Sequence, residues 1–183
     1  MVSEKTKKNL WEAFAGESMA RNKYVRFAKI AKKEGHQAIE KIFLETAENE
    51  VEHAGRIAKL LGNGVFADNT SENLKRAFDG ETYEWTDMYP RFFKDAKANG
   101  DEEAAAFFEN ITKAESHHAK RYARFKELLD SGKLYEDDEE VYWFCTNCGH
   151  IHKGRKAPEE CPTCKHPQGY FVRKCMLEYG EEK

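Results

Sequence analysis

The sequence predicts an all-α four-helix bundle followed by a small domain organised by four cysteines. Two observations support this fold class. Over the first 130 residues, apolar side chains recur every three or four residues, and the one proline there is Pro90. All five cysteines lie between Cys145 and Cys175, together with the other three prolines. A segment of about 40 residues is too small to fold on an apolar core alone, so we expect a metal to organise it.

The composition of this 183-residue, 21.2 kDa chain excludes several classes of protein. The mean hydropathy is -0.86, and no apolar run approaches the roughly 18 residues of a membrane span, so we expect no membrane segment. No apolar stretch that would indicate a signal peptide follows the N-terminal lysines, which favours a cytoplasmic protein. The net charge of -3 argues against a nucleic-acid-binding protein, whose surface carries a basic excess.

Four stretches carry an apolar stripe along one face and are predicted to be helices. The stripes cover residues 10–31, 39–60, 74–92 and 104–129. Breaks that contain glycine, at residues 33–35, 62–64 and 99–100, separate them. Asn69, Thr70 and Ser71 are candidate caps for the third helix. Because the connections are short, neighbouring helices should pack antiparallel in a bundle.

The first two helices and the last two form an internal repeat. At an offset of 65 residues, Glu50 matches Glu115 and His53 matches His118. Gly16-Glu17 matches Gly80-Glu81 at an offset of 64, so the third helix has gained one residue between Glu81 and Tyr89. A single inserted residue is usually absorbed as a π-bulge, and π-bulges are frequent at functional sites. Simple duplication of a helical hairpin explains the same repeat without any function.

Charged residues interrupt the apolar stripes at positions that favour metal binding. A Glu and a His three residues apart point the same way on a helix, so Glu50-x-x-His53 and Glu115-x-x-His118 each present two ligands inward. Unpaired buried carboxylates would repel each other, whereas two divalent metals neutralise four of them. One Glu from each of two helices, here Glu17 and Glu81, plus Glu-x-x-His from each of the others, is the di-iron pattern of ferritin-like bundles.

Oxygen and imidazole ligands favour iron or manganese at this site, although zinc would also fit the ligands. Glu84 has no partner in the repeat and lies three residues beyond Glu81. It is either a surface residue or a fifth carboxylate that balances extra positive charge when the metals are oxidised. Tyr24 and Tyr89 lie about two turns from Glu17 and Glu81 and either orient ligand carboxylates or pack in the core.

The cysteines form a second metal-binding pattern, Cys145-x-x-Cys148 and Cys161-x-x-Cys164. Four thiolates in a tetrahedron suit zinc or a single iron, and spacing alone favours a structural zinc ribbon. Cys175 lies outside the pattern, and we expect an ordinary thiol there. A glycine and an acidic run separate this module from the helices. We therefore expect a helical domain over residues 1–131, a linker over 132–141 and a four-cysteine domain over 142–183.

Several motifs, in order along nearly the whole chain, together resemble rubrerythrin. They are Glu17, Glu50-x-x-His53, Gly80-Glu81-Thr82-Tyr83-Glu84-Trp85, Glu115-x-x-His118 and the two Cys-x-x-Cys pairs. The resemblance implies a ferritin-like bundle with a carboxylate-bridged site for two irons. It further implies a rubredoxin-like domain, related in design to a zinc ribbon, with one iron on four thiolates. The implied metal ligands are Glu17, Glu50, His53, Glu81, Glu84, Glu115 and His118 for the pair, and Cys145, Cys148, Cys161 and Cys164 for the single iron.

The resemblance also implies an activity. Rubrerythrins are cytoplasmic peroxidases that reduce hydrogen peroxide to water and protect against oxidative stress. Their electrons pass from NAD(P)H through a reductase, often through a separate rubredoxin, to the four-cysteine iron and then to the di-iron pair. The residues that match Glu84 and His53 are alternative ligands of one iron, and we expect Glu84, His53, Tyr24 and Tyr89 to take part in catalysis. Family members are commonly homodimers in which the four-cysteine iron of one subunit faces the di-iron site of the other.

One position departs from the family pattern. Rubredoxin-like knuckles usually have Gly after both Cys pairs, but here Gly149 follows the first pair and Lys165 the second. The sequence contains no Gly-rich nucleotide-binding motif, so we expect NADH to bind elsewhere. Two other functions remain open at this point. One is a ferroxidase or iron-handling ferritin-like protein, and the other is a non-enzymatic module with a zinc ribbon for partner contact.

Overall fold

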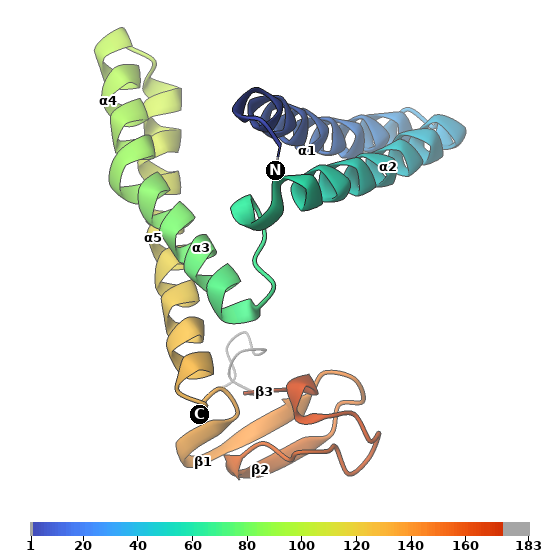
Figure 1. Cartoon of the computed structure of the whole chain (residues 1–183), viewed down its shortest axis with the longest axis vertical. Helices are drawn as coiled ribbons and strands as arrows, with labels where there is room; N and C mark the ends of the chain where they lie inside the picture. The colour runs from blue at the N-terminus through green and yellow to red at the C-terminus, as the bar shows by residue number, and fades with distance from the viewer. Residues whose placement is uncertain (1, 174–183) are drawn as a thin grey trace. The chain divides into compact units, whose positions relative to one another are not determined.

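The computed structural model describes residues 2–173, which fall into two compact units divided between Asn73 and Leu74 (Figure 1). All four stretches predicted to be helical are helical. Within the described residues, no helix is long and apolar enough to cross a lipid bilayer. Cys175, predicted to be an ordinary thiol, lies outside the described residues.

The first unit is a helical hairpin of α1 (Glu4–Lys33) and α2 (Gln37–Leu61). Ser3 caps α1, because its hydroxyl accepts a hydrogen bond from the backbone N–H of Thr6 at 3.2 Å. The chain reverses at Gly35, whose φ of 84° is open to glycine at little cost. After α2 comes the short 3-10 helix η1 (Gly62–Gly64). The side chains buried in this unit are mostly small: Ala28, Ala31, Ala47, Ala58 and Leu61.

The second hairpin begins with α3 (Thr70–Tyr83), which starts in the last residues of the first unit. It continues through the π-helical turn η2 (Glu84–Met88) into α4 (Tyr89–Asn99), and α5 (Glu102–Asp130) follows. The N–H of Tyr89 bonds to the carbonyl of Glu84, five residues back. The predicted π-bulge between Glu81 and Tyr89 is therefore confirmed. Gly100, at a φ of 76°, ends α4 in the left-handed conformation.

The C-terminal domain contains β1 (Glu136–Cys145), β2 (Ile151–Lys156), the 3-10 turn η3 (Gln168–Tyr170) and β3 (Phe171–Arg173). The strands form an antiparallel sheet in the order β2-β1-β3. Its small core holds Trp143, Phe171, Ala157 and two of the cysteines, Cys145 and Cys161. The indole N–H of Trp143 donates to the carbonyl of Gly154 at 2.9 Å. Because apolar burial is so limited, the cysteines are part of the core itself.

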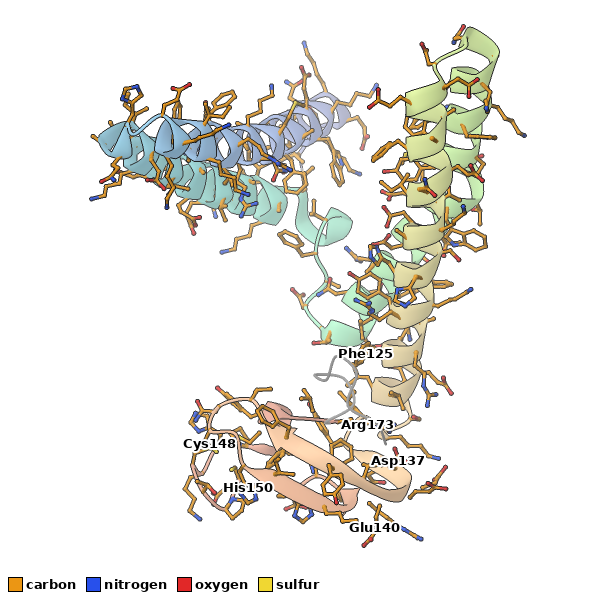
Figure 2. All side chains as sticks on the ribbon, turned by 180° about the vertical axis from the view of Figure 1, so that it is seen from behind. Phe125, Asp137, Glu140, Cys148, His150 and Arg173 are labelled. Atoms are coloured by element: carbon orange, nitrogen blue, oxygen red, sulfur yellow. The ribbon has the colours of Figure 1, made fainter. Side chains whose placement is uncertain are left out.

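An ion pair closes one end of this domain. Nη1 of Arg173 lies 2.8 Å from the Asp137 carboxylate, and Nη2 donates to the backbone carbonyl of Glu136. Figure 2 shows Asp137 and Arg173 at one end of the small domain, and Cys148 and His150 at the other. These contacts attach β3 to the start of β1. Strand β1 therefore begins at Glu136, inside the stretch 132–141 that we predicted to be a linker.

Candidate metal centres

The first hairpin brings Glu17 from α1 together with Glu50 and His53 from α2. One ligand atom from each of these three side chains lies within 4.8 Å of the other two. Nδ1 of His53 is 2.8 Å from Oε2 of Glu50 and 3.8 Å from Oε2 of Glu17. The i, i+3 spacing on α2 sets the shorter distance, and helix packing across the hairpin sets the longer one.

The second hairpin repeats this arrangement with Glu81 from α3 and Glu115 and His118 from α5. Nδ1 of His118 is 2.6 Å from Oε2 of Glu115 and 3.5 Å from Oε2 of Glu81. Glu115 is buried, with 9% of its surface exposed, although a glutamate side chain is normally ionised and solvated. Burial of a carboxylate is costly unless a cation or hydrogen bonds compensate it, so this position favours a metal ligand.

Matching aromatic clusters support the two groups. Tyr24 stacks on Phe43 with ring centroids 6.2 Å apart, and Tyr89 stacks on Phe108 with centroids 6.1 Å apart. In each hairpin a second phenylalanine, three residues beyond the tyrosine, completes the cluster. The ring centroid of Phe27 lies 5.5 Å from that of Phe43, and the centroid of Phe92 lies 5.5 Å from that of Phe108. The structure therefore shows both tyrosines packing against aromatic neighbours.

The close carboxylates of each cluster shift one another's pKa values. A hydrogen bond with Glu50, together with burial, raises the pKa of Glu17. The same bond, with a second one from His53, lowers the pKa of Glu50. Burial, then the hydrogen bond and charge of Glu115, raise the pKa of Glu81. Binding of a divalent cation would require these carboxylates to lose any protons they hold. Carboxylate oxygens beside an imidazole nitrogen in each cluster are donors that fit iron.

Glu84 is the first residue of the π-helical turn. Burial, followed by the negative charge of Glu115, raises its pKa. Burial and then the charges of Glu84, Glu115 and Glu81 raise the pKa of Tyr89. Glu84 and Tyr89 thus lie in the field of the second cluster, although Glu84 is outside its three-residue ligand group. The side chain of Glu84 is half-buried.

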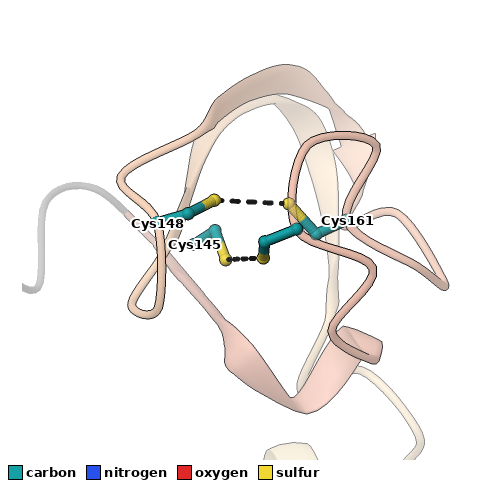
Figure 3. Close-up of side chains that lie close together, drawn as sticks. Cys145, Cys148 and Cys161 are labelled. Atoms are coloured by element: carbon teal, nitrogen blue, oxygen red, sulfur yellow. Dashed lines mark hydrogen bonds between the residues drawn. The ribbon is translucent and has the colours of Figure 1, made fainter.

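The four cysteines gather at the end of the C-terminal domain (Figure 3). Sγ of Cys145 lies 3.7 Å from Sγ of Cys164, and Sγ of Cys148 lies 3.7 Å from Sγ of Cys161. A tetrahedral metal with bonds of about 2.3 Å to sulfur requires sulfur–sulfur edges of roughly 3.8 Å. The four thiols are therefore spaced for a metal ion.

Backbone N–H groups bias these thiols toward the thiolate. The N–H of His166 is the main cause that lowers the pKa of Cys164 to about 6. The N–H of His150 acts in the same direction on Cys148, but burial and the other thiols raise the pKa of Cys148 to about 12. Metals bind the thiolate, so metal binding at this cluster would release the protons of the thiols.

The two cysteine loops have the same backbone design. Gly149 N–H donates to the Cys145 carbonyl and Lys165 N–H to the Cys161 carbonyl, each at 2.9 Å. Both residues have positive φ, 78° for Gly149 and 62° for Lys165. Lys165 is the one described non-glycine residue with a positive φ. The second loop therefore keeps the turn that glycine would favour, at the cost of placing a side chain in the left-handed region.

Sequence analysis alone misses several polar residues beside these clusters. His150 Nδ1 lies 3.1 Å from Thr163 Oγ1, and the His166 ring meets Tyr170 edge-on with centroids 4.4 Å apart. Each histidine follows a cysteine by two residues, which is the signal that could have identified it. In the described part of the chain, Thr82 Oγ1 and Trp85 Nε1 are buried without a hydrogen-bond partner. Both belong to the motif at residues 80–85.

Comparison with known proteins agrees with this pair of centres. Residues 8–126 match the family model for rubrerythrin, and residues 143–172 match the model for the rubredoxin-like domain of rubrerythrin. The chain belongs to the rubrerythrin family. A rubrerythrin of Porphyromonas gingivalis is 45% identical over 177 residues, covering 91% of this chain and 88% of that protein.

Other rubrerythrins have comparable similarity. Rubrerythrin-1 of Clostridium acetobutylicum is 44% identical, with 91% of this chain and 93% of that protein covered. A rubrerythrin of Nitratidesulfovibrio vulgaris is 42% identical, with 93% and 95% covered. The predicted fold class, a ferritin-like bundle followed by a rubredoxin-like domain, is confirmed. So are the predicted cofactor sites, since the chain carries the Glu and His groups of the rubrerythrin di-iron site and a four-cysteine iron site.

Proposed function

We propose that this protein is a non-haem di-iron peroxidase that reduces hydrogen peroxide to water and protects against oxidative stress. The observation that carries the proposal is the presence of both centres, a Glu/His site and a four-thiolate site, in one chain. Reduction of peroxide needs a place where two electrons are available and a route by which they are restored. An iron-handling bundle would not need the second centre.

The reaction consumes two electrons and two protons for each peroxide, breaks the O–O bond and releases two water molecules. When the di-iron site is loaded and reduced, its two ferrous ions supply the two electrons. The residues proposed to hold them are Glu17, Glu50, His53, Glu81, Glu84, Glu115 and His118. The chain's own contribution is to hold the ions, to orient these carboxylates and to store protons close to the reacting oxygens.

Glu84 and Tyr89 are the proposed proton stores. The raised pKa of Glu84 means that its carboxyl keeps a proton to a higher pH than a surface glutamate does. The raised pKa of Tyr89 keeps its hydroxyl protonated beside the same carboxylates. Tyr24 is the equivalent residue of the first hairpin. Ring packing against phenylalanines holds both tyrosines in a fixed orientation, which suits a proton donor.

His53 and Glu84 are proposed to act as alternative ligands of one iron, as the family resemblance implies. The two side chains have different environments. The His53 side chain is 60% exposed on its hairpin, whereas Glu84 is half-buried in a π-helical turn. A neutral histidine favours a lower positive charge on the metal and a carboxylate favours a higher one. Exchange between them would therefore match the ligand charge to the charge of the site.

The four-cysteine domain is proposed to receive single electrons from a separate donor protein. Thiolate-bound iron suits this role because it changes charge by one without rearrangement of its ligands. The donor would be a rubredoxin or an NAD(P)H-dependent reductase. We further propose a cytoplasmic homodimer, in which the four-cysteine iron of one subunit serves the di-iron site of the other.

The proposal is tested by rapid mixing of the fully reduced, iron-loaded protein with peroxide or with oxygen under otherwise equal conditions. Peroxide should reoxidise the protein much faster than oxygen does. The oxidised four-cysteine iron should be red and should bleach on reduction. The variant Cys145→Ser should lose this colour and keep the helical signal in circular dichroism.

Two results would contradict the proposal. Reoxidation by oxygen at least as fast as by peroxide would favour a ferroxidase or iron-handling protein. A colourless protein with zinc at the four-cysteine site and full activity would show that this site does not carry electrons.

A further inference from the structure

We infer that the hydroxyl of Thr82 and the indole N–H of Trp85 together bind one buried water molecule, and that this water holds the carboxylate of Glu81 in place. The inference concerns metal affinity and does not depend on the reaction proposed above. It follows from two buried polar atoms that have no protein partner, from a comparison of the two hairpins, and from the position of both residues beside Glu81.

Two hydrogen-bonding atoms of the second hairpin are buried and have no partner within the described part of the chain. They are Oγ1 of Thr82 and Nε1 of Trp85. A buried donor without a hydrogen bond loses its hydration without compensation, so native proteins nearly always supply a protein group or an ordered water as its partner. Because an indole N–H can only donate, the partner of Trp85 must be an acceptor.

The internal repeat shows that the Thr82 hydroxyl differs from related hydroxyls in the helices. At the offset of 64 residues, Thr82 matches Ser18. Oγ of Ser18 donates to the carbonyl of Phe14, four residues earlier on the same helix, at 2.7 Å. The hydroxyls of Thr86 and Thr112 make the same kind of bond at 2.6 and 2.7 Å. Thr82 does not make this bond, so its hydroxyl can bind a group outside its own helix.

Thr82 and Trp85 lie close to each other and to Glu81. They are three residues apart, and Trp85 follows Glu81 by four residues. Side chains at these spacings are neighbours on a helix, with Cβ atoms about 5–6 Å apart. Two hydrogen bonds of about 2.9 Å, joined at one water molecule, span such a distance. The two donors can therefore share one water beside the Glu81 carboxylate.

The chemistry of the surroundings favours a neutral ligand. Glu81 and Glu115 belong to the same cluster, and their carboxylates would repel an anion. An N–H donor, in turn, does not bind a cation. Water accepts one bond each from Thr82 and Trp85 and donates one to Glu81, which gives the roughly three bonds typical of buried water. Carboxylates that bind metal are themselves held by hydrogen bonds, and this water supplies such a bond to Glu81.

Nuclear magnetic resonance of the full-length protein, isotope-labelled at tryptophan and loaded with diamagnetic zinc, tests for the water. The indole proton of Trp85 should show a nuclear Overhauser effect to water, with the sign of a long-lived bound molecule. The indole of Trp143 donates to the carbonyl of Gly154 and should show none, which makes it the internal reference. Absence of the effect at Trp85 would overturn the inference, because its N–H would then bond to a protein acceptor.

Variants of Thr82 connect the water to metal binding. Thr82→Val removes the hydroxyl at nearly constant size, so it should abolish the water signal and lower the ferrous affinity of the bundle about 10-fold. Thr82→Ser keeps the hydroxyl and should retain both. Ser18→Ala removes a hydroxyl that bonds to its own helix, and it should change neither. Anaerobic competition with a chromogenic chelator measures the affinity, and constant metal at the four-cysteine site verifies folding.

Trp85→Phe provides an independent test of the shared water. Because one water serves both donors, Thr82→Val should weaken ferrous binding less in the Trp85→Phe background than in the wild-type protein. Equal losses in the two backgrounds would overturn the inference, and so would a Thr82→Val protein with wild-type affinity. These samples contain no peroxide, so their outcome is separate from the test of the proposed reaction.

Discussion

Glu84 combines two properties. Burial raises the pKa of its carboxyl group, and the residue lies in the only π-helical turn of the described residues. Glu84→Gln should lower the rate of peroxide reduction by roughly 100-fold, in the range typical of a lost proton donor. Iron content should change little, because the other carboxylates remain. The measurement is single-turnover reoxidation by peroxide, together with metal analysis.

The matched control is Asp87→Asn, in the same turn. Asp87 is exposed and lies 3.7 Å from Arg91, so its loss should leave the rate unchanged. Equal losses of rate in the two variants would indicate a general effect of the turn and not of the Glu84 carboxyl.

Lys165 holds a backbone conformation that glycine adopts more easily. Lys165→Gly should stabilise the iron-loaded C-terminal domain by about 1 kcal/mol, because the left-handed region costs a residue with a side chain roughly that much. Its exposed ion pair with Glu160, at 3.2 Å, contributes little. Loss of the red colour in denaturant should shift to higher concentration. Gly149→Ala in the first loop should shift this loss of colour to lower denaturant concentration. A shift in the same direction for both variants would refute this account.

At the scale of one element, the π-helical turn separates Glu81 from Tyr89 by one residue more than Glu17 is separated from Tyr24. Deletion of the exposed Thr86 should restore a regular helix. We expect circular dichroism to show unchanged helicity and iron binding to persist, as in the uninterrupted first hairpin. Peroxide reduction should slow, because the carboxylate of Glu84 changes its position relative to Tyr89. Retention of the full rate would show that the extra residue has no part in the chemistry.

The elements differ in how far their sequences reveal them. Helix and π-turn positions follow from local periodicity, from the repeat and from a single inserted residue, so they could be predicted. The start of β1 could not, because an acidic run resembles a solvated linker. In the folded domain Glu136 pairs with Lys156 at 3.4 Å and Glu140 with Lys153 at 3.6 Å. The run is a strand because its backbone pairs with β2, whose lysines face its acidic side chains, and no local window of sequence contains that pairing.

The metal-binding residues likewise have some properties that the sequence predicts and others that it does not. The Glu-x-x-His spacing predicted which ligands share a helix, since i and i+3 always face one way. The exposure of His53 and the burial of Glu115 depend on how helices pack, which the spacing does not specify. The roles of Glu84, His53, Tyr24 and Tyr89 stay predictions for the same reason.

At the scale of the whole molecule, the metal should determine stability. The raised pKa values of Glu17, Glu81 and Glu84 favour their protonated forms in the folded apoprotein. Their contribution is full below the unfolded pKa of about 4.3 and is lost as the pH rises through the raised values. Glu50, with its lowered pKa, acts in the opposite sense. The apoprotein should therefore lose stability from acid toward neutral pH.

Iron binding has the opposite pH dependence, because the ligands must lose protons to bind metal. The melting temperature of the iron form should exceed that of the apoprotein most at neutral pH, and the gap should narrow in mild acid. Calorimetry of the iron form and of the apoprotein, from mildly acidic to neutral pH, measures this difference in melting temperature. E50Q/E115Q should bind no bundle iron yet leave an apoprotein at least as stable as the wild-type apoprotein. Failure of this double variant to fold under any condition would assign these glutamates a structural role without metal.

The alanines between α1 and α2 have a consequence for the time course of folding. Small residues let two helices approach through contacts that are local in sequence, and local contacts form quickly. Formation of the first hairpin should therefore be a fast refolding phase whose rate does not depend on protein concentration. Stopped-flow circular dichroism of the apoprotein at several protein concentrations measures this phase. A helical signal that recovers in a single slow phase would contradict this account.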